Sequence, residues 1–300
     1  MGYWPTTQSI DMTATAGIAL PDIQAWSDNR GTSIDAVGIK GLRYPLTISS
    51  GGKSLPTIAT LSMTVGLSAV TKGTHMSRFI ELLETQSKPL EQRDFKRMVF
   101  DMLARLRASH GTIEIQFPYF VTKAAPVSGV QSRLDYEVRW VGAVTADGVY
   151  SFAMQVLVPA TSLCPCSKEI SKYGAHNQRT HISIRASLAS EMAIEELIKI
   201  AERCASCELY GLLKRQDEKH VTERAYENPK FVEDLVRDVA LALCGDHRVS
   251  SFLVEAENFE SIHNHSAFAR IVQSPANVRE NRPRTGHGTN FPVLVAASRS

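Results

Sequence analysis

The stretch "LDYEVRWVGAVTADGVYSFAMQVLV", residues 134–158, decides the fold. Large apolar residues recur at every second position from Leu134 to Trp140, and again from Tyr150 to Val158. A period of two is typical of a strand that buries one face. The stretch therefore predicts two strands, one closing a first group of elements and one opening a second group.

The same order of elements is predicted on both sides of this stretch. Apolar residues recur at helical spacing, every three or four positions, after Pro89 and after Pro229. Proline suits the first turn of a helix, so a helix is predicted to begin at each proline. The first group is predicted as strands at 36–48 and 60–70, helices at 77–86 and from Pro89, and strands at 112–120 and 134–144. The second is predicted as strands at 149–158 and 180–188, helices at about 190–214 and from Asn228-Pro229, and strands at 250–257 and 267–272.

Strand, strand, helix, helix, strand, strand thus occurs twice, which predicts an α+β fold with antiparallel sheets and helices on one face. We expect an N-terminal arm over 1–34, a first unit over 35–148, a second unit over 149–273 and a C-terminal tail over 274–300. The two units share a pattern of elements but no residue-level identity.

Composition narrows the functional class. Of the 300 residues, 43% are apolar and 21% charged, and the net charge of +2 gives no reason to expect nucleic-acid binding. No window approaches the roughly 18 apolar residues of a membrane span. Five cysteines, an odd number, do not suggest a disulfide framework. We therefore expect a reduced, cytoplasmic protein with no membrane contact.

Reactive side chains gather in "TSLCPCSKEISKYGAHNQRTH", residues 161–181. We expect a long loop at a sheet end between Val158 and Thr180, a favoured place for function. A proline between Cys164 and Cys166 predicts an extended path with both thiols on one side. Such a pair can hold a metal, or present one thiolate while the other packs.

A catalytic zinc-type site uses three protein ligands and leaves one position for water. Cys164 and His176 are candidates for the sulfur and nitrogen ligands. The polar link at 214–224 offers a third ligand in Asp217, Glu218 or His220, and spacing does not choose among them. A mixed S/N/O site can hold Zn or Mn, and Fe as well.

The remaining cysteines suggest packing. Cys204 and Cys207 fall in a helical pattern without a second C-x-x-C, and Cys244 ends a predicted helix. Neither of the glycine-rich phosphate-binding motifs is present, so nucleotide phosphates would have to meet scattered lysines and arginines.

Four segments, "GTHMSRF" (73–79), "SLCPCSKEIS" (162–171), "GAHNQR" (174–179) and "ENFESIH" (257–263), resemble the type IB GTP cyclohydrolases. The resemblance runs from about Pro21 to Ser274. It implies the tunnelling fold, with two ββααββ units in one chain. It also implies a homo-oligomer, here a tetramer, whose sheets close into a barrel and whose active sites lie between subunits. The implied reaction converts GTP and water to 7,8-dihydroneopterin triphosphate and formate, the first step of folate biosynthesis.

The resemblance also implies a role for particular residues. The metal ligands match Cys164, His176 and Glu218, with Cys164 part of the catalytic centre. The guanine-reading carboxylate matches Glu233, and the catalytic proton-transferring histidine matches His263, with His265 as a substitute. Candidates for the triphosphate are Lys168 and Arg179, followed by Arg78 and Arg185.

Two other readings stay open. The nitrile reductase of the queuosine pathway shares the fold and uses a cysteine nucleophile, although its lysine-rich cofactor motif has no counterpart here. A non-catalytic zinc-stabilised oligomer would use Cys166 as a fourth ligand and leave no position for water. An archaeal relative that releases a cyclic phosphate is a closer variant.

Overall fold

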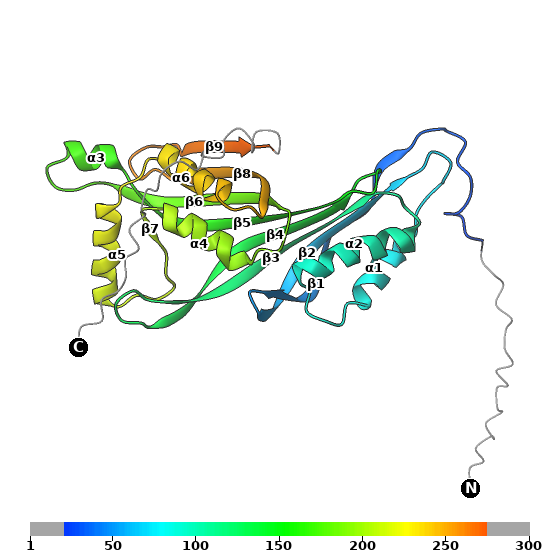
Figure 1. Cartoon of the computed structure of the whole chain (residues 1–300), viewed down its shortest axis with the longest axis horizontal. Helices are drawn as coiled ribbons and strands as arrows, with labels where there is room; N and C mark the ends of the chain where they lie inside the picture. The colour runs from blue at the N-terminus through cyan, green and yellow to red at the C-terminus, as the bar shows by residue number, and fades with distance from the viewer. Residues whose placement is uncertain (1–20, 275–300) are drawn as a thin grey trace, which may run out of the picture.

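The computed structural model describes residues 21–274 and contains one antiparallel sheet, in the order β1-β2-β3-β4-β5-β6-β8-β9, with the short β7 paired to β5 (Figure 1). The first unit consists of β1 (Ile34–Ser50), β2 (Lys53–Leu67), α1 (Ser77–Glu84), α2 (Gln92–Leu106), β3 (Gly111–Ala124) and β4 (Gln131–Val144). The second consists of β5 (Tyr150–Leu163), α3 (Pro165–Ile170), β6 (Asn177–Leu188), α4 (Ile194–Cys204), β7 (Cys207–Glu208), α5 (Arg215–Glu227), α6 (Val232–Cys244), β8 (Val249–Asn258) and β9 (Ala267–Gln273).

The predicted α+β class is confirmed, and the double ββααββ order is that of the tunnelling fold. The second unit adds α3, β7 and α5 to the basic pattern. The stretch at 134–158 forms the junction, because β4 pairs with β5 from Val144 opposite Tyr150 to Glu137 opposite Leu157. One sheet therefore runs through both units.

An aromatic cluster lies where the helices cover this junction. Trp140 of β4 packs edge-on against Phe95 of α2, Phe117 of β3 and Phe152 of β5, with ring centroids 5.5–6.0 Å apart. All four side chains are buried. Edge-to-face aromatic pairs add to the gain from area burial, so this cluster stabilises α2 on the sheet and joins the two units.

Helix α2 begins at Gln92, not at Pro89 as predicted. Leu90 lies beside β1 instead: its N–H donates to the carbonyl of Thr47 at 2.7 Å, and its own carbonyl accepts from Ser49 at 2.9 Å. The main-chain N–H and carbonyl of Leu90 are thus hydrogen-bonded to β1 and not to a first helical turn.

The predicted helices of the second unit also need correction. The segment at 190–214 is not one helix, because α4 ends at Cys204 and the chain then pairs with β5 through β7. The polar link at 214–224 is itself helical, as α5. Asn228 ends α5 rather than capping α6, and its side-chain amide donates to the carbonyl of Ala205 at 2.9 Å.

The terminal segments 1–20 and 275–300 lie outside the described residues, and with them most of the predicted arm and tail. Of the arm, residues 21–34 are described: Ser27 forms an isolated bridge to Thr71, and Ile34 already begins β1. Within 21–274, no helix is both long and apolar enough to cross a membrane.

Candidate functional site

The cysteine-rich stretch is mostly regular structure rather than a long loop. Strand β5 runs to Leu163, opposite Asn177 of β6, and α3 fills part of the interval. Pro165 is the first residue of α3 and Cys164 caps it, so the predicted extended path is wrong. Residues two apart on a helix face different directions. Cys164 is half-buried and Cys166 is exposed.

Cys164 and His176 are neighbours at this sheet end. The N–H of Cys164 donates to the carbonyl of His176 at 3.1 Å, one step beyond the last β5–β6 pair. Ser167 links the two residues further: its N–H donates to Cys164 Sγ at 3.4 Å, its Oγ donates to the Cys164 carbonyl at 3.1 Å, and that Oγ accepts from His176 N at 3.2 Å. Main-chain bonds therefore hold both candidate ligands in place.

Three side chains surround His176 that sequence reasoning did not single out. The imidazole Nδ1 lies 3.0 Å from Gln178 Oε1, 3.4 Å from Ser261 Oγ and 3.9 Å from Glu260 Oε2. If Nδ1 carries the proton and donates to Gln178, then Nε2 is left as a lone-pair ligand, the arrangement usual for metal-binding histidines. Glu260 and Ser261 lie within the segment "ENFESIH", so this motif was the sequence feature that could have identified them.

The loop between β8 and β9 brings His263 to the same end of the sheet. Ser261, two residues earlier, approaches His176, so the β8–β9 loop and the β5–β6 end lie together. His263 is exposed and stacks on His265, with ring centroids 5.2 Å apart and planes 3° from parallel. The structure thus places His263 near the pair, with its ring in solvent.

Glu233 is also near this end. The N–H of Lys230 donates to the carbonyl of Leu163 at 3.1 Å, which seats the start of α6 beside the residue that precedes Cys164. Glu233 lies in the first turn of α6 and is exposed. A carboxylate there is favoured by the helix dipole, and it is free to meet a ligand.

Glu218 is the exception. It lies exposed in the first turn of α5, whereas the last turn of α5 adjoins α3 through a hydrogen bond from Lys168 Nζ to the carbonyl of Tyr226. The eight residues from Glu218 to Tyr226 correspond to about 12 Å of helix. Figure 1 shows α5 running along the end of the sheet, away from α3. Glu218 is therefore not beside Cys164 of the same chain.

Within residues 21–274, no three His, Cys, Asp or Glu side chains converge as a metal-binding group. Cys164 and His176 fit a borderline-soft metal such as zinc by donor type and mutual position. No third donor joins this pair among the described residues of one chain.

The other two candidates for the third ligand differ from Glu218. Asp217 is completely buried and accepts hydrogen bonds from Val127, Ser128 and Lys214. Burial would raise its pKa, but these hydrogen bonds outweigh burial and hold the pKa far below its usual value. His220 is exposed on α5. Asp217 has no oxygen left over for a metal.

The candidates for the triphosphate are not equally free. Lys168 is occupied by the Tyr226 carbonyl, and its ammonium lies over the Tyr226 ring at 4.4 Å. Arg179 is exposed on β6. Burial and the nearby charge of Arg179 lower the pKa of His181, which packs edge-on against Phe259. Of the two predicted residues, Arg179 is the better placed to meet an anion.

The remaining cysteines are free thiols, and Cys207 lies opposite Thr161 of β5. Cys204 is the last residue of α4 and Cys207 lies in β7, so the two are not on one helix face as expected. Burial raises the pKa of both thiols to about 11. They are therefore protonated at neutral pH and suited to packing rather than to zinc.

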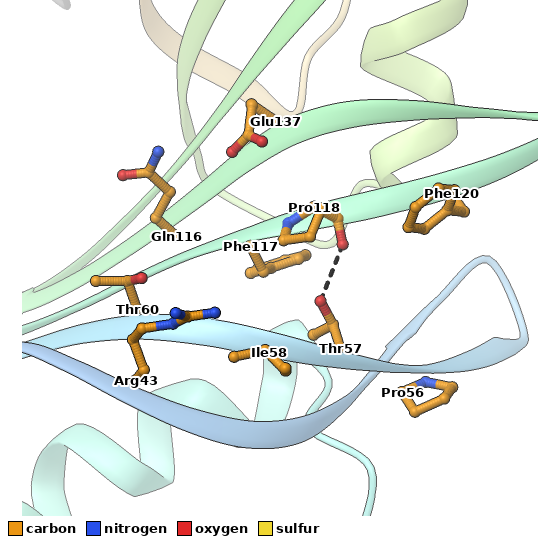
Figure 2. A pocket seen from close by; sticks show the side chains of 10 residues that line it. All are labelled: Arg43, Pro56, Thr57, Ile58, Thr60, Gln116, Phe117, Pro118, Phe120 and Glu137. Carbon is orange, nitrogen blue, oxygen red and sulfur yellow. Dashed lines mark hydrogen bonds between the residues drawn. The ribbon is translucent and has the colours of Figure 1, made fainter.

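A pocket of about 540 Å³ lies on the helix-free face of β1–β4 (Figure 2). Arg43, Thr60 and Gln116 form one cross-strand row of its lining, and Glu137 closes one side. None of the predicted site residues lines it. The concavity therefore belongs to the sheet of the first unit and not to the candidate site.

The fold and the site define a tunnelling-fold protein with a Cys–His pair at one sheet end. A family model described as type I GTP cyclohydrolase folE2 matches residues 20–269. GTP cyclohydrolase FolE2 of Paraburkholderia xenovorans (strain LB400) is 59% identical over 253 residues, covering 84% of this chain and 94% of that protein. GTP cyclohydrolase FolE2 1 of Dechloromonas aromatica (strain RCB) is 57% identical over 261 residues, covering 87% of this chain and 98% of that protein. The chain belongs to the type I GTP cyclohydrolase FolE2 family.

Among solved structures, uricase from Arthrobacter globiformis aligns with a TM-score of 0.47 and 8% identity, over 86% of this chain and 96% of that one.

Proposed function

We propose that this chain is a GTP cyclohydrolase, which converts GTP and water to 7,8-dihydroneopterin triphosphate and formate at the start of folate biosynthesis. Membership of the FolE2 family, at 59% identity to a relative of that name, is the observation that carries the proposal. The relative is covered over 94% of its length, and the aligned part includes both units.

Cys164, His176 and Glu218 would hold a divalent metal, Zn or Mn, with Fe as a further candidate. When bound, such an ion supplies Lewis-acid activation of water near neutral pH, which attack on a poorly electrophilic aromatic carbon requires. The residues at hand support the pair: Ser167 and the β5–β6 ladder fix Cys164 and His176, and Gln178 orients the imidazole.

The third ligand would come from a second copy of the chain. Glu218 is exposed in the first turn of α5, about two helical turns away from the end of that helix that adjoins α3. A site formed between subunits brings Glu218 of one copy to Cys164 and His176 of another, and a closed homo-oligomer such as a tetramer repeats that contact.

Glu233 would read the base. Guanine presents N1–H and its 2-amino group side by side, and one carboxylate accepts both hydrogen bonds. The exposed position of Glu233 at the start of α6, on the Cys164 side of the sheet, supports this role.

His263 would move protons during ring opening and formate release. An imidazole exchanges protons near neutral pH, and its loop already touches His176 through Ser261. Arg179 would contact the triphosphate from β6, and Lys168 would do so only after leaving Tyr226.

The decisive experiment incubates metal-reconstituted full-length protein with GTP and measures formate, together with a fluorescent pterin after oxidation. Stoichiometric formate and pterin are the expected result. A cyclic phosphate product would instead indicate the archaeal variant. If the protein releases no formate but oxidises a reduced nicotinamide cofactor in the presence of a nitrile substrate, the nitrile reductase hypothesis would replace the proposal.

A further inference from the structure

Helix α5, which carries Glu218, is attached to the protein by few apolar contacts. Of its 13 residues, only Asp217 and Ala225 are buried. Most helices in proteins are stabilised by packing of an apolar face. Since α5 lacks such a face, its position depends on polar contacts at particular residues.

Asp217 provides the main contact of this kind. Its Oδ1 accepts from the main-chain N–H groups of Val127 and Ser128, both at 2.8 Å. Its Oδ2 accepts from Ser128 Oγ at 2.6 Å and from Lys214 N at 2.8 Å. The side chain is 0% exposed. Four donors therefore satisfy the carboxylate, and each fixes its orientation.

These donors belong to two units of the protein. Val127 and Ser128 form the tip of the β3–β4 hairpin, where Ala125 N donates to the Val130 carbonyl at 2.9 Å and Gly129 adopts φ +70°. Successive N–H groups that converge on one oxygen make an anion-binding nest. Asp217 fills this nest with a residue from the second unit, and its bond to Lys214 closes the first turn of α5.

We propose that Asp217 is a positioning residue for the metal ligand Glu218. By clamping the first turn of α5 to the β3–β4 hairpin, Asp217 sets where the next residue presents its carboxylate to Cys164 and His176 of a second copy. The inference rests on the proposed function for the identity of the site. It gives the β3–β4 hairpin of the first unit a role in positioning a ligand that belongs to the second unit.

Three variants test this proposal in the full-length oligomer. Asp217→Asn keeps an oxygen for the hairpin N–H groups but turns an N–H₂ towards Ser128 Oγ and Lys214 N, so α5 loses part of its tether while the hairpin N–H groups keep their acceptor. Ser128→Ala removes one of the four hydrogen bonds to Asp217, together with a 3.4 Å hydrogen bond from Val130 N to Ser128 Oγ. Glu223→Gln is the matched control, because it removes one negative charge from an exposed position of the same helix.

Zinc affinity is measured by competition with a chromophoric chelator, at a temperature where circular dichroism shows each variant to be folded. We expect Asp217→Asn to bind zinc about 10–100-fold more weakly, the usual effect of losing a partner that orients a ligand. Ser128→Ala should lie between it and wild type, and Glu223→Gln should match wild type. Saturating zinc should restore kcat of Asp217→Asn, whereas Glu218→Gln should stay inactive.

Two results overturn the inference: unchanged zinc affinity in Asp217→Asn, or a kcat that saturating zinc does not restore although the variant is folded. If Asp217→Asn does not fold, Ser128→Ala decides by the same affinity criterion. Normal metal binding by Glu218→Gln would also count against the inference, because Glu218 would then be no ligand to position. The proposed function fails separately, when the wild type releases no formate from GTP.

Discussion

The main-chain N–H of Cys164 donates a hydrogen bond to the carbonyl of His176 across 3.1 Å, at the end where β5 and β6 stop pairing. Cys164 and His176 are twelve positions apart in the sequence, yet they are fixed to each other by the sheet and by Ser167. A metal at this point would find sulfur and nitrogen donors already in place, with little chain entropy left to lose.

Cys164 and Cys166 should differ sharply when each is replaced by alanine. Cys164→Ala should lose bound metal and activity together, because the half-buried thiol of Cys164 is the sulfur donor in the proposed site. Cys166→Ala should keep its metal, since Cys166 is exposed at another face of α3. Metal content by elemental analysis checks both, and equal loss in the two variants would indicate a closed structural site.

Glu218 and Cys164 should complement each other between chains. Cys164→Ala and Glu218→Gln are each expected to be inactive as pure oligomers. When the two are dissociated, mixed and reassembled, some interfaces combine the intact Cys164 of one chain with the intact Glu218 of another. Formate release should then reappear. Mixtures that stay inactive, despite verified subunit exchange, would mean that both ligands come from one chain.

Glu233→Gln should weaken GTP binding without changing metal content. The amide places a donor against one of the two donors of guanine, and a mismatched polar group costs about 1–3 kcal/mol. Since 1.4 kcal/mol corresponds to tenfold, we expect Kd for GTP to rise about 5- to 150-fold. Calorimetric titration measures this, and an unaltered Kd would remove Glu233 from base reading.

His263→Ala should separate proton transfer from binding. We expect normal metal content, near-normal GTP binding and turnover at least about a hundredfold slower, as for loss of a general acid–base group. A ring-opened formamide intermediate should accumulate. His265→Ala is the control, because it removes the stacked neighbour and leaves His263. Lost metal in His263→Ala would make His263 a ligand, and normal turnover would make it a surface residue.

Arg248 should stabilise the second unit in a pH-dependent way. Its guanidinium donates to Glu196 at 2.7 Å and to Asp246 at 2.7 Å, and these hydrogen bonds lower the pKa of both carboxyls. A depressed carboxyl pKa adds stability above the unfolded pKa of about 4, and this contribution is lost as pH falls through the folded values.

We therefore expect Arg248→Met to lower Tm at pH 7. Glu196 is partly exposed, so solvent screening limits the effect to about 1 kcal/mol, or about 2–4 °C for a chain of this size. The difference from wild type should shrink below pH 4. Arg237→Met, which breaks only an exposed pair, should leave Tm unchanged. A difference that does not depend on pH would exclude these ion pairs as its cause.

Sequence by itself determined the strands and the apolar helices. The alternation in β4 and β5 and the stripe in α2 record which side chains face the core, because burial of one face imposes a period of two or about 3.6. It also placed Cys164 and His176 in one segment, and the four motifs predicted the family that the comparisons show.

Only the tertiary structure decided what depends on contacts distant in the chain. Leu90 pairs with β1 in place of the predicted helical turn. Helix α5 has no apolar stripe, and the contact that holds its first turn joins Asp217 to a hairpin about ninety residues earlier. Hydrogen bonds of this kind leave no period in the sequence. For the same reason spacing left Asp217, Glu218 and His220 equivalent and only the family resemblance pointed to Glu218, whereas the fold shows that the hairpin and Lys214 occupy both oxygens of Asp217.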